Sequence, residues 1–456
     1  MRTKSHGQFL KNSNELTIKY GIRNMVRNFF KQNSLDKILL LSFVLAPLLG
    51  SITLAATIYL VSFSLFDFKY RAKEHRPEYP FKLIGLIFVI YFCSLAFLET
   101  FHAPTIITQI RELGKIFPIF VIGAFAYFLD SKRFKLTYKS VGDAAVIGIY
   151  LTLSIACFLK LLSLLFPDFL AYSLGGNDLG VSGGRLTLGS GNALPFGTLL
   201  ITISFITLLE ISKKNSLNQI ISFGAFIIGI ATVIFWNGSR GPSLAGVPLL
   251  LLAVWYLVLG KELKENRVIV SLIATCVIIT SAMFFTSDSK VLQNLSIGLN
   301  VLLDFKPNFE IESSLGQRVV MYKAAFETFL QNPMLGYGIV NKFSSVIPIL
   351  QRDGYTFTYT HLHSTFLNHM LSAGLFGLLS ISVLIITPLI DLYRRKIAIP
   401  KEGYYFSLII MISMVFNGLT NVLIMHDLIA HFFGILILTN AICHYNSNKN
   451  LSISPK

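Results

Sequence analysis

Most of the chain consists of apolar runs of about 17 to 25 residues, separated by short polar segments. About 20 apolar residues are enough for a helix to cross the hydrocarbon core of a bilayer. The pattern therefore predicts an all-α polytopic membrane protein with about twelve transmembrane helices. We expect these spans at about 36–66 (two short spans divided at Pro47 and Gly50), 83–98, 113–129, 143–166, 193–210, 218–236, 243–260, 268–286, 366–389, 404–420 and 428–442.

One polar interruption is much longer than the others and covers residues 287–365. Within it, residues 317–331 have apolar side chains at helical spacing, and Pro333 and Gly336 follow as helix-stopping residues. We expect an amphipathic helix here, lying on the membrane or over a cavity. Its expected apolar face consists of Val319, Tyr322, Phe326, Phe329 and Leu330.

Positive charge sets the expected orientation. The net charge is +16, and the Lys- and Arg-dense loops occur at every second break between apolar runs, which places them all on one side of the membrane, as the positive-inside rule requires. This distribution indicates anionic membrane lipids as partners and excludes nucleic acid. We expect a multi-pass membrane protein without a cleavable signal peptide and with both termini cytoplasmic. The expected divisions are a basic N-terminal arm at 1–35, spans 1–9 at 36–286, a large loop on the outside at 287–365, spans 10–12 at 366–443 and a cytoplasmic tail at 444–456.

No metal or cofactor motif stands out in the sequence. The four cysteines lie in or beside apolar runs without metal-ligand spacing, and there is no Asp-x-Asp in an outside loop and no Walker-type glycine loop. We therefore expect a reaction that needs no metal and no cofactor. A metal site assembled from distant carboxylates such as Asp178, Asp288 or Asp353 stays open as an alternative.

Cations on the less basic side of the membrane need a separate explanation, because they are costly near hydrocarbon and often mark a ligand path. For Lys115 and Lys160 we favour simple contact with lipid headgroups. Arg240 stands between Gly238 and Gly241 in a tight turn where the backbone can approach a ligand closely. The cations of this group are Arg111, Lys115, Lys160, Arg185, Arg240 and Arg318.

His363 lies where the long polar segment re-enters an apolar run. A histidine at such a boundary can take a proton from a hydroxyl, whereas Arg240 and Arg318 can bind phosphate oxygens through their planar guanidinium groups. A base and two anion-binding groups are what a transferase with a lipid diphosphate donor requires. The alternative is that His363 only caps the following helix.

Four motifs resemble the O-antigen ligase and polymerase superfamily. His363-Ser364 precedes Gly374-x-x-Gly377 at the spacing of the family signature, and residues 237–241 (Asn-Gly-Ser-Arg-Gly) are similar to its Ser-Arg-Gly turn. Residues 316–318 (Gly-Gln-Arg) and 332–338 resemble its long-loop helix and the turn after it, and residues 184–195, from Gly-Arg-Leu-Thr to Pro195, resemble a further loop motif. The sequence departs from many ligases at Leu378-Leu379, where those have small hydroxyl residues.

The resemblance implies a metal-independent, inverting glycosyltransferase of the GT-C type in the bacterial inner membrane, which works on the periplasmic face. The loop at 287–365 would then be a large periplasmic loop. Its donor would be a glycan on undecaprenyl diphosphate, and its acceptor a sugar hydroxyl of lipid A-core or of another lipid-linked glycan. His363 would be the general base, and Arg240 and Arg318, the other catalytic residues, would hold the diphosphate. Arg185 would contact the substrate. We count Arg111 and His361 as further candidate substrate-binding residues, and we expect His361, beside the base, to have an orientation or packing role. The remaining histidines of this region, His369, His426 and His431, are expected to be structural.

Three alternatives to an O-antigen ligase remain. A polymerase of the same family differs only in its acceptor, which the sequence barely distinguishes. A secondary transporter would also have about twelve spans, but it would more often show related halves and ionisable residues at mid-membrane. A membrane scaffold without activity would not explain the isolated arginines.

Overall fold

We analysed a computed structural model of the protein. The structure describes residues 25–30, 32–48, 55–56, 58–59, 79–102, 105–129, 133–165, 181–182, 185–188, 192–211, 214, 216–258, 314–355, 361–394 and 400–453. These residues are helical apart from turns and the short antiparallel pair of β1 (Val181–Ser182) and β2 (Arg185–Leu186). The long helices are α2 (Ser34–Leu45), α4 (Tyr79–Glu99), α5 (Ile106–Phe128), α6 (Tyr138–Leu165), α8 (Ala193–Ile206), α9 (Ser216–Ala231), α10 (Arg240–Val258), α13 (Ser314–Gln331), α16 (Thr365–Arg394), α17 (Lys401–Thr420) and α18 (Asp427–Ile453).

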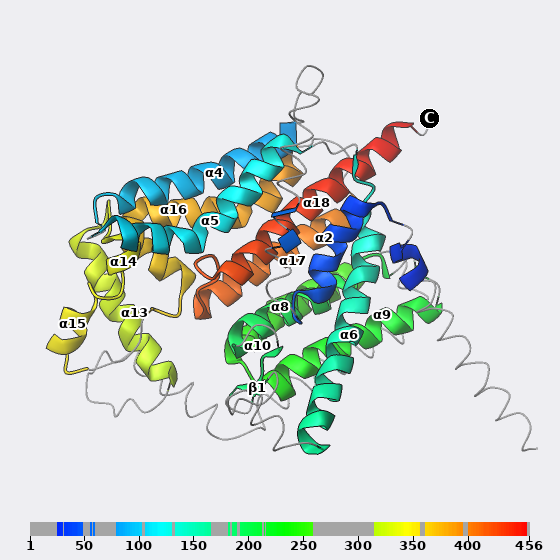
Figure 1. The fold of residues 1–456 in the computed structure, drawn as a ribbon, viewed down its shortest axis with the longest axis horizontal. Coiled ribbons are helices and arrows are strands. Elements are labelled where there is room, and N and C mark those ends of the chain that lie inside the picture. The colour runs from blue at the N-terminus through cyan, green and yellow to red at the C-terminus, as the bar shows by residue number, and fades with distance from the viewer. Residues whose placement is uncertain are drawn as a thin grey trace, which may run out of the picture.

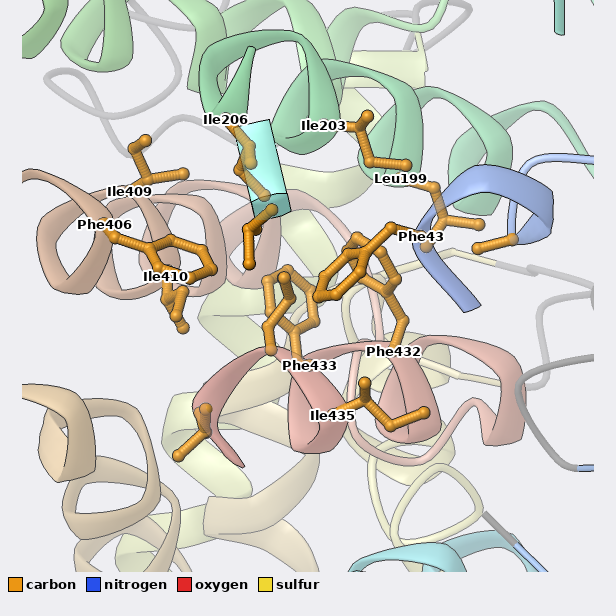
Figure 2. Close-up of a cluster of buried hydrophobic side chains, with 14 of the residues drawn as sticks. Phe43, Leu199, Ile203, Ile206, Phe406, Ile409, Ile410, Phe432, Phe433 and Ile435 are labelled. Atoms are coloured by element: carbon orange, nitrogen blue, oxygen red, sulfur yellow. The ribbon is translucent and has the colours of Figure 1, made fainter. Parts of the chain in front are cut away.

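Helix α18 is the centre of the bundle. Its candidate membrane segment, Leu428–Ser447, is 94% buried, whereas those of the other candidate spans are 33% to 56% buried. Its Phe432 and Phe433 meet Phe43 of α2 and apolar side chains of α8 and α17 (Figure 2). An α-helix that is apolar all round is stable only when other helices or lipid surround it, and here other helices do so.

Seven helices of the described residues are long and apolar enough to cross a membrane, and α8 is a shorter apolar helix. The chain is therefore a multi-pass membrane protein, as expected. Helix α2 corresponds to the first of the two short spans expected in 36–66. The span expected at 268–286 lies outside the described residues, so the number twelve stays a prediction.

The helices form a compact arrangement in which α4, α5 and α16 lie side by side (Figure 1). Gly85 of α4 and Gly123 of α5 allow the closest approach, because a Cβ at Gly85 would lie 2.6 Å from the Gly123 carbonyl oxygen. The helices α13, α14 (Gly338–Asn341) and α15 (Ile347–Arg352) cover the end of this group (Figure 1). The segment around the candidate site therefore rests on three long helices.

The amphipathic helix expected at 317–331 is present as α13, and the face that it packs on the protein differs from its expected apolar face. Phe326 and Leu330 are 53% and 60% exposed, whereas Met321, Ala324 and Ala325 are buried. Small side chains let α13 lie close to its neighbours, and a pattern reading that weights large apolar residues misses such a face.

Candidate active site

His363 stands directly before α16, and its backbone is held in an unusual conformation. Its φ is +49°, in the left-handed region that non-glycine residues rarely adopt. Both neighbours are buried: Leu362 is fully enclosed, and the Ser364 hydroxyl accepts a hydrogen bond from the Leu367 amide at 3.4 Å. The surrounding packing thus fixes the backbone and the position of the imidazole, a pattern common at functional sites.

The imidazole of His363 is half-buried beside positive charge. Burial lowers its pKa to about 4, and positive charge on His361 and Arg318 contributes in the same direction. The His361 ring lies close, with 4.3 Å between the ring centroids. His363 is therefore neutral at pH 7 and able to accept a proton.

Tyr322 connects α13 to this site. Its hydroxyl donates to the backbone carbonyl oxygens of His363 and Leu419, each at 2.9 Å. Burial raises the pKa of Tyr322 to about 12, against the opposing effect of Arg318, so the hydroxyl stays protonated as a donor. Arg318 lies one helical turn before Tyr322, and the same docking therefore brings its guanidinium toward His363.

The turn that carries Arg240 is organised by Asn237, which is fully buried. Its side-chain amide donates to the carbonyl oxygens of Leu186 at 2.7 Å and Ala193 at 2.9 Å, and its Oδ1 accepts from the Ser239 amide at 3.2 Å. Gly238 follows with a φ of +61° and ends the preceding π-helix, η4 (Thr232–Asn237). Arg240 then begins α10 with an exposed side chain.

The same asparagine places Arg185 near the turn. Arg185 pairs with Ser182 across the two-residue ladder and precedes Leu186, whose carbonyl accepts from Asn237. Two segments that are about 50 residues apart in the sequence are thereby joined by one buried side chain.

The end of α17 joins these parts, and the sequence analysis did not identify it. The Leu419 carbonyl accepts from Tyr322, and a Cβ on Gly241 would collide with the Thr420 hydroxyl. The Thr365 hydroxyl donates to the Asn421 carbonyl at 2.8 Å and accepts from the Leu423 amide at 2.8 Å. Three consecutive residues, 419–421, thus contact α13, α10 and the start of α16. In the sequence, the polar residues that interrupt the apolar run at 417–421 were the signal that could have indicated a functional role for this end of α17.

The Gly374-x-x-Gly377 motif and the turn after α13 contact each other directly. Helix α16 is kinked at Gly374, which has a φ of +59°, and the Leu375 amide donates to the Pro333 carbonyl at 2.8 Å. Gly336, with a φ of +68°, lies against the same kink, and the Tyr337 amide donates to the Leu371 carbonyl at 2.7 Å. The two motifs therefore form one contact, between residues 333–337 and 371–375, which fixes the position of α13 relative to α16. We call this contact the joint.

Arg111 lies in a different part of the site, beside a cavity of about 410 Å³ lined by Arg111, Gly114, Lys115, Met425 and His426. Lys115 is not simply a headgroup contact, because its amine is 2.5 Å from the Glu112 carboxylate and lines this cavity. His426 is half-buried in the cavity wall, which differs from the buried structural role expected for it.

His361 faces both parts of the site. Burial lowers its pKa, and the positive charges of Lys342, His426, Arg318 and Lys115 add to this effect. His369, in contrast, is enclosed, with Nδ1 2.7 Å from the Thr365 carbonyl oxygen and Nε2 2.5 Å from the Tyr91 hydroxyl. Its packing role agrees with the expectation. Among the residues that the structure describes, no group of three or more His, Cys, Asp or Glu side chains is placed to hold a metal ion.

Comparison with known proteins supports the motif reading. Residues 224–382 match the family described as O-antigen ligase, a segment that includes Arg240, Arg318 and His363. The chain is 27% identical over 285 residues to a ComP-specific O-oligosaccharyltransferase of Acinetobacter baylyi, covering 59% of this chain and 45% of that protein. It is also 24% identical over 187 residues to an uncharacterized protein of Haemophilus influenzae, covering 40% of this chain and 46% of that protein. The chain thus spans about half the length of these curated relatives.

Proposed function

Because residues 224–382 place this chain in the O-antigen ligase family, we propose that it is a membrane glycosyltransferase that moves a glycan from a lipid diphosphate to an acceptor hydroxyl. The donor in this proposal is a glycan on undecaprenyl diphosphate, and the acceptor is lipid A-core. The enzyme is of the GT-C type, with about twelve spans in the bacterial inner membrane, both termini in the cytoplasm and its site on the periplasmic face.

The observation that carries this proposal is the docking of α13 on His363, through the hydrogen bond from the Tyr322 hydroxyl to the His363 carbonyl at 2.9 Å. His363 is fixed by its buried neighbours, and Arg318, one helical turn before Tyr322, contributes to lowering its pKa. An anionic donor bound at Arg318 would offset that contribution and raise the pKa of His363 from its lowered value. The base would therefore become stronger when the donor is in place.

The proposed reaction is a single displacement. The acceptor oxygen attacks the anomeric carbon while the bond from that carbon to the diphosphate oxygen breaks, which inverts the configuration. The hydroxyl proton passes to His363, and undecaprenyl diphosphate leaves with the bonding electrons. Arg240 and Arg318 stabilise its negative charge, and Arg185 contacts the substrate. No metal takes part in this proposal.

Two other acceptors are candidates. A polymerase would use the terminal sugar of a second lipid-linked glycan. The name of the Acinetobacter baylyi relative, a ComP-specific O-oligosaccharyltransferase, makes a protein hydroxyl the other candidate. The residues around His363 do not favour one hydroxyl over another, so the experiment must separate the three.

The test is a chromosomal His363→Gly variant. Glycine adopts a φ of +49° without strain, so this change removes the imidazole and keeps the backbone. We expect transfer to fall by about 10²- to 10⁴-fold, as for loss of a general base, and to recover in part when imidazole is added to membrane vesicles. A Lys160→Gln variant, which removes an exposed cation from α6, serves as the control.

Gel analysis of lipopolysaccharide and immunoblotting give the result. Uncapped core with accumulated full-length lipid-linked polymer supports the ligase, and a single repeat on the core indicates a polymerase. Normal lipopolysaccharide with an unglycosylated acceptor protein indicates protein glycosylation. Normal transfer to all acceptors at a normal protein level contradicts the role of His363.

A further inference from the structure

The cavity beside Arg111 has the composition of an anion site that the proposed reaction has not used. We propose that it is a second anion-binding subsite, which holds a phosphate of a lipid-anchored acceptor while Arg240 and Arg318 hold the donor diphosphate. The assignment to the acceptor rests on the proposed function. The anion site itself rests on the cavity and the charges around it.

Glu112 organises the cations of the cavity. Its side chain is only 8% exposed and lies 2.5 Å from the Lys115 amine and 3.4 Å from Nε of Arg111. One carboxylate thus holds two cations on one side of α5. Their remaining N–H groups stay available, because the Arg111 and Lys115 side chains are 70% and 47% exposed. Such charged N–H groups form short, strong hydrogen bonds to phosphate oxygens.

Lys342 adds a third cation to this region. Burial lowers its pKa to about 8, opposed by Glu112 and Glu99, so the amine is largely protonated at neutral pH. Glu99, whose carboxylate accepts hydrogen bonds from the backbone amides of Ile339 and Val340 at the start of α14, is the second carboxylate that interacts with Lys342. The cations around the cavity therefore outnumber the carboxylates.

The helix that carries these cations indicates what kind of molecule brings the phosphate. Ile107 and Ile110, in the first turns of α5, are 80% and 66% exposed. Ile107, Arg111, Gly114 and Lys115 follow one another at helical spacing on one face. An apolar surface that leads into a cationic cavity suits a phosphorylated glycolipid, with its acyl or prenyl chain against the isoleucines. It is a poorer fit for a protein acceptor.

The position of the cavity relative to the base favours the acceptor over the donor. His361 interacts electrostatically with Lys115 and His426, which line the cavity, and with Lys342, and its ring lies tilted against that of His363 with 4.3 Å between the centroids. Arg318 also acts on both imidazoles. His361 is therefore within electrostatic range of both the cavity cations and Arg318. An acceptor held in the cavity can present its hydroxyl to His363 while the donor diphosphate remains near Arg318.

Gly114 provides a test that leaves the charges in place. A Cβ at this position would meet no atom within 4 Å, so a larger side chain can enter the cavity without disturbing the helix. Gly114→Phe should block the site, and Gly114→Ala should have a smaller effect. Lys115→Gln removes one cation, and Lys160→Gln removes an exposed cation from α6 as the matched control.

The first measurement is the binding of inorganic diphosphate to the full-length protein in phosphatidylcholine nanodiscs, by calorimetry. We expect two sites in the wild type. Lys115→Gln and Gly114→Phe should weaken one of them at least about tenfold, Arg240→Gln should weaken the other, and Lys160→Gln should weaken neither. Two sites that survive Lys115→Gln and Gly114→Phe unchanged would overturn the proposal.

The second measurement is transfer in the same nanodiscs with purified core glycolipid and lipid-linked donor. Lys115→Gln should raise KM for the acceptor about tenfold and leave KM for the donor within twofold. An unchanged acceptor KM contradicts the acceptor assignment. Loss of diphosphate binding in phosphatidylglycerol nanodiscs also contradicts it, since bilayer headgroups would then fill the cavity. If His363→Gly and Arg240→Gln transfer normally while Lys115→Gln still loses diphosphate, the proposed function fails and the anion site stands.

Discussion

At the scale of single residues, the site depends on how the protein controls the protonation of His363. An exposed imidazole has a pKa near 6.5, and a fraction of it would be protonated in a mildly acidic periplasm. Burial and the neighbouring positive charges remove that fraction by lowering the pKa to about 4. Only the neutral form can take the acceptor proton, so the environment keeps the base in its active form.

This leads to a prediction for pH dependence. In the wild type, kcat/KM should stay level as pH falls from 7 to 5, and should decrease only as pH falls through the lowered pKa of His363. Arg318→Gln removes the smallest of the causes that lower this pKa, so the acidic limb should move to higher pH while burial still keeps it below 6.5, in addition to any loss in rate. The pH profiles of kcat/KM for the wild type and Arg318→Gln in nanodiscs check this, with Lys160→Gln as control.

A wild-type midpoint near pH 6.5 that Arg318→Gln does not move would contradict the electrostatic coupling. In that case Arg318 would have no effect on the pKa of His363. A rise in the KM for the donor in Arg318→Gln would then indicate that Arg318 acts in donor binding alone.

At the scale of elements, the joint between α16 and the turn after α13 decides where Arg318 and Tyr322 lie. Gly374 and Gly336 both have left-handed φ values, and their backbones touch: a Cβ at Gly336 would lie 2.6 Å from the Gly374 amide nitrogen. Any side chain here would separate α13 from α16. The hydrogen bond from Tyr322 to His363 depends on that contact.

We therefore expect Gly374→Ala to reduce transfer at least about tenfold and to destabilise the protein by about 1–3 kcal/mol, because the strain and the collision add. Gly246→Ala in α10 is the matched control. Its nearest neighbour is Ile201 at 3.5 Å, and its φ is not left-handed, so alanine should be neutral or should stabilise by about 0.5–1 kcal/mol. Thermal unfolding in detergent and transfer rates measure both. Equal behaviour of the two variants would contradict the role of the joint.

At the scale of the whole molecule, the buried helix α18 ties the N-terminal and C-terminal parts together. It packs on α2, α4, α5, α8, α16 and α17, which belong to both halves of the chain. The candidate site is likewise built from segments far apart in the sequence, since β2, α10, α13, α16 and the end of α17 all contribute. The site can therefore form only when most of the bundle has assembled.

The proposed topology predicts which positions are accessible from the periplasm. In a variant without native cysteines, a cysteine at Arg352 should react with a membrane-impermeant maleimide in intact spheroplasts. A cysteine at Tyr393, which is 89% exposed, should react only after the membrane is permeabilised. Both positions lie outside the buried core, so differences in folding should be small. Labelling of both from the same side would contradict the proposed orientation.

The sequence by itself determined the class of the protein, the existence of α13, the order of the four motifs and the candidates His363, Arg240 and Arg318. These are local properties: apolar run length, charge distribution and residue spacing can be read along the chain. The buried face of α13, the contacts at the end of α17 and the cavity beside Arg111 were decided by tertiary structure alone. Tyr322 meets Leu419 across 97 residues, and Thr365 meets Asn421 across 56. The lowered pKa of His363 has the same origin, because burial and the approach of charges from other helices exist only in the folded chain.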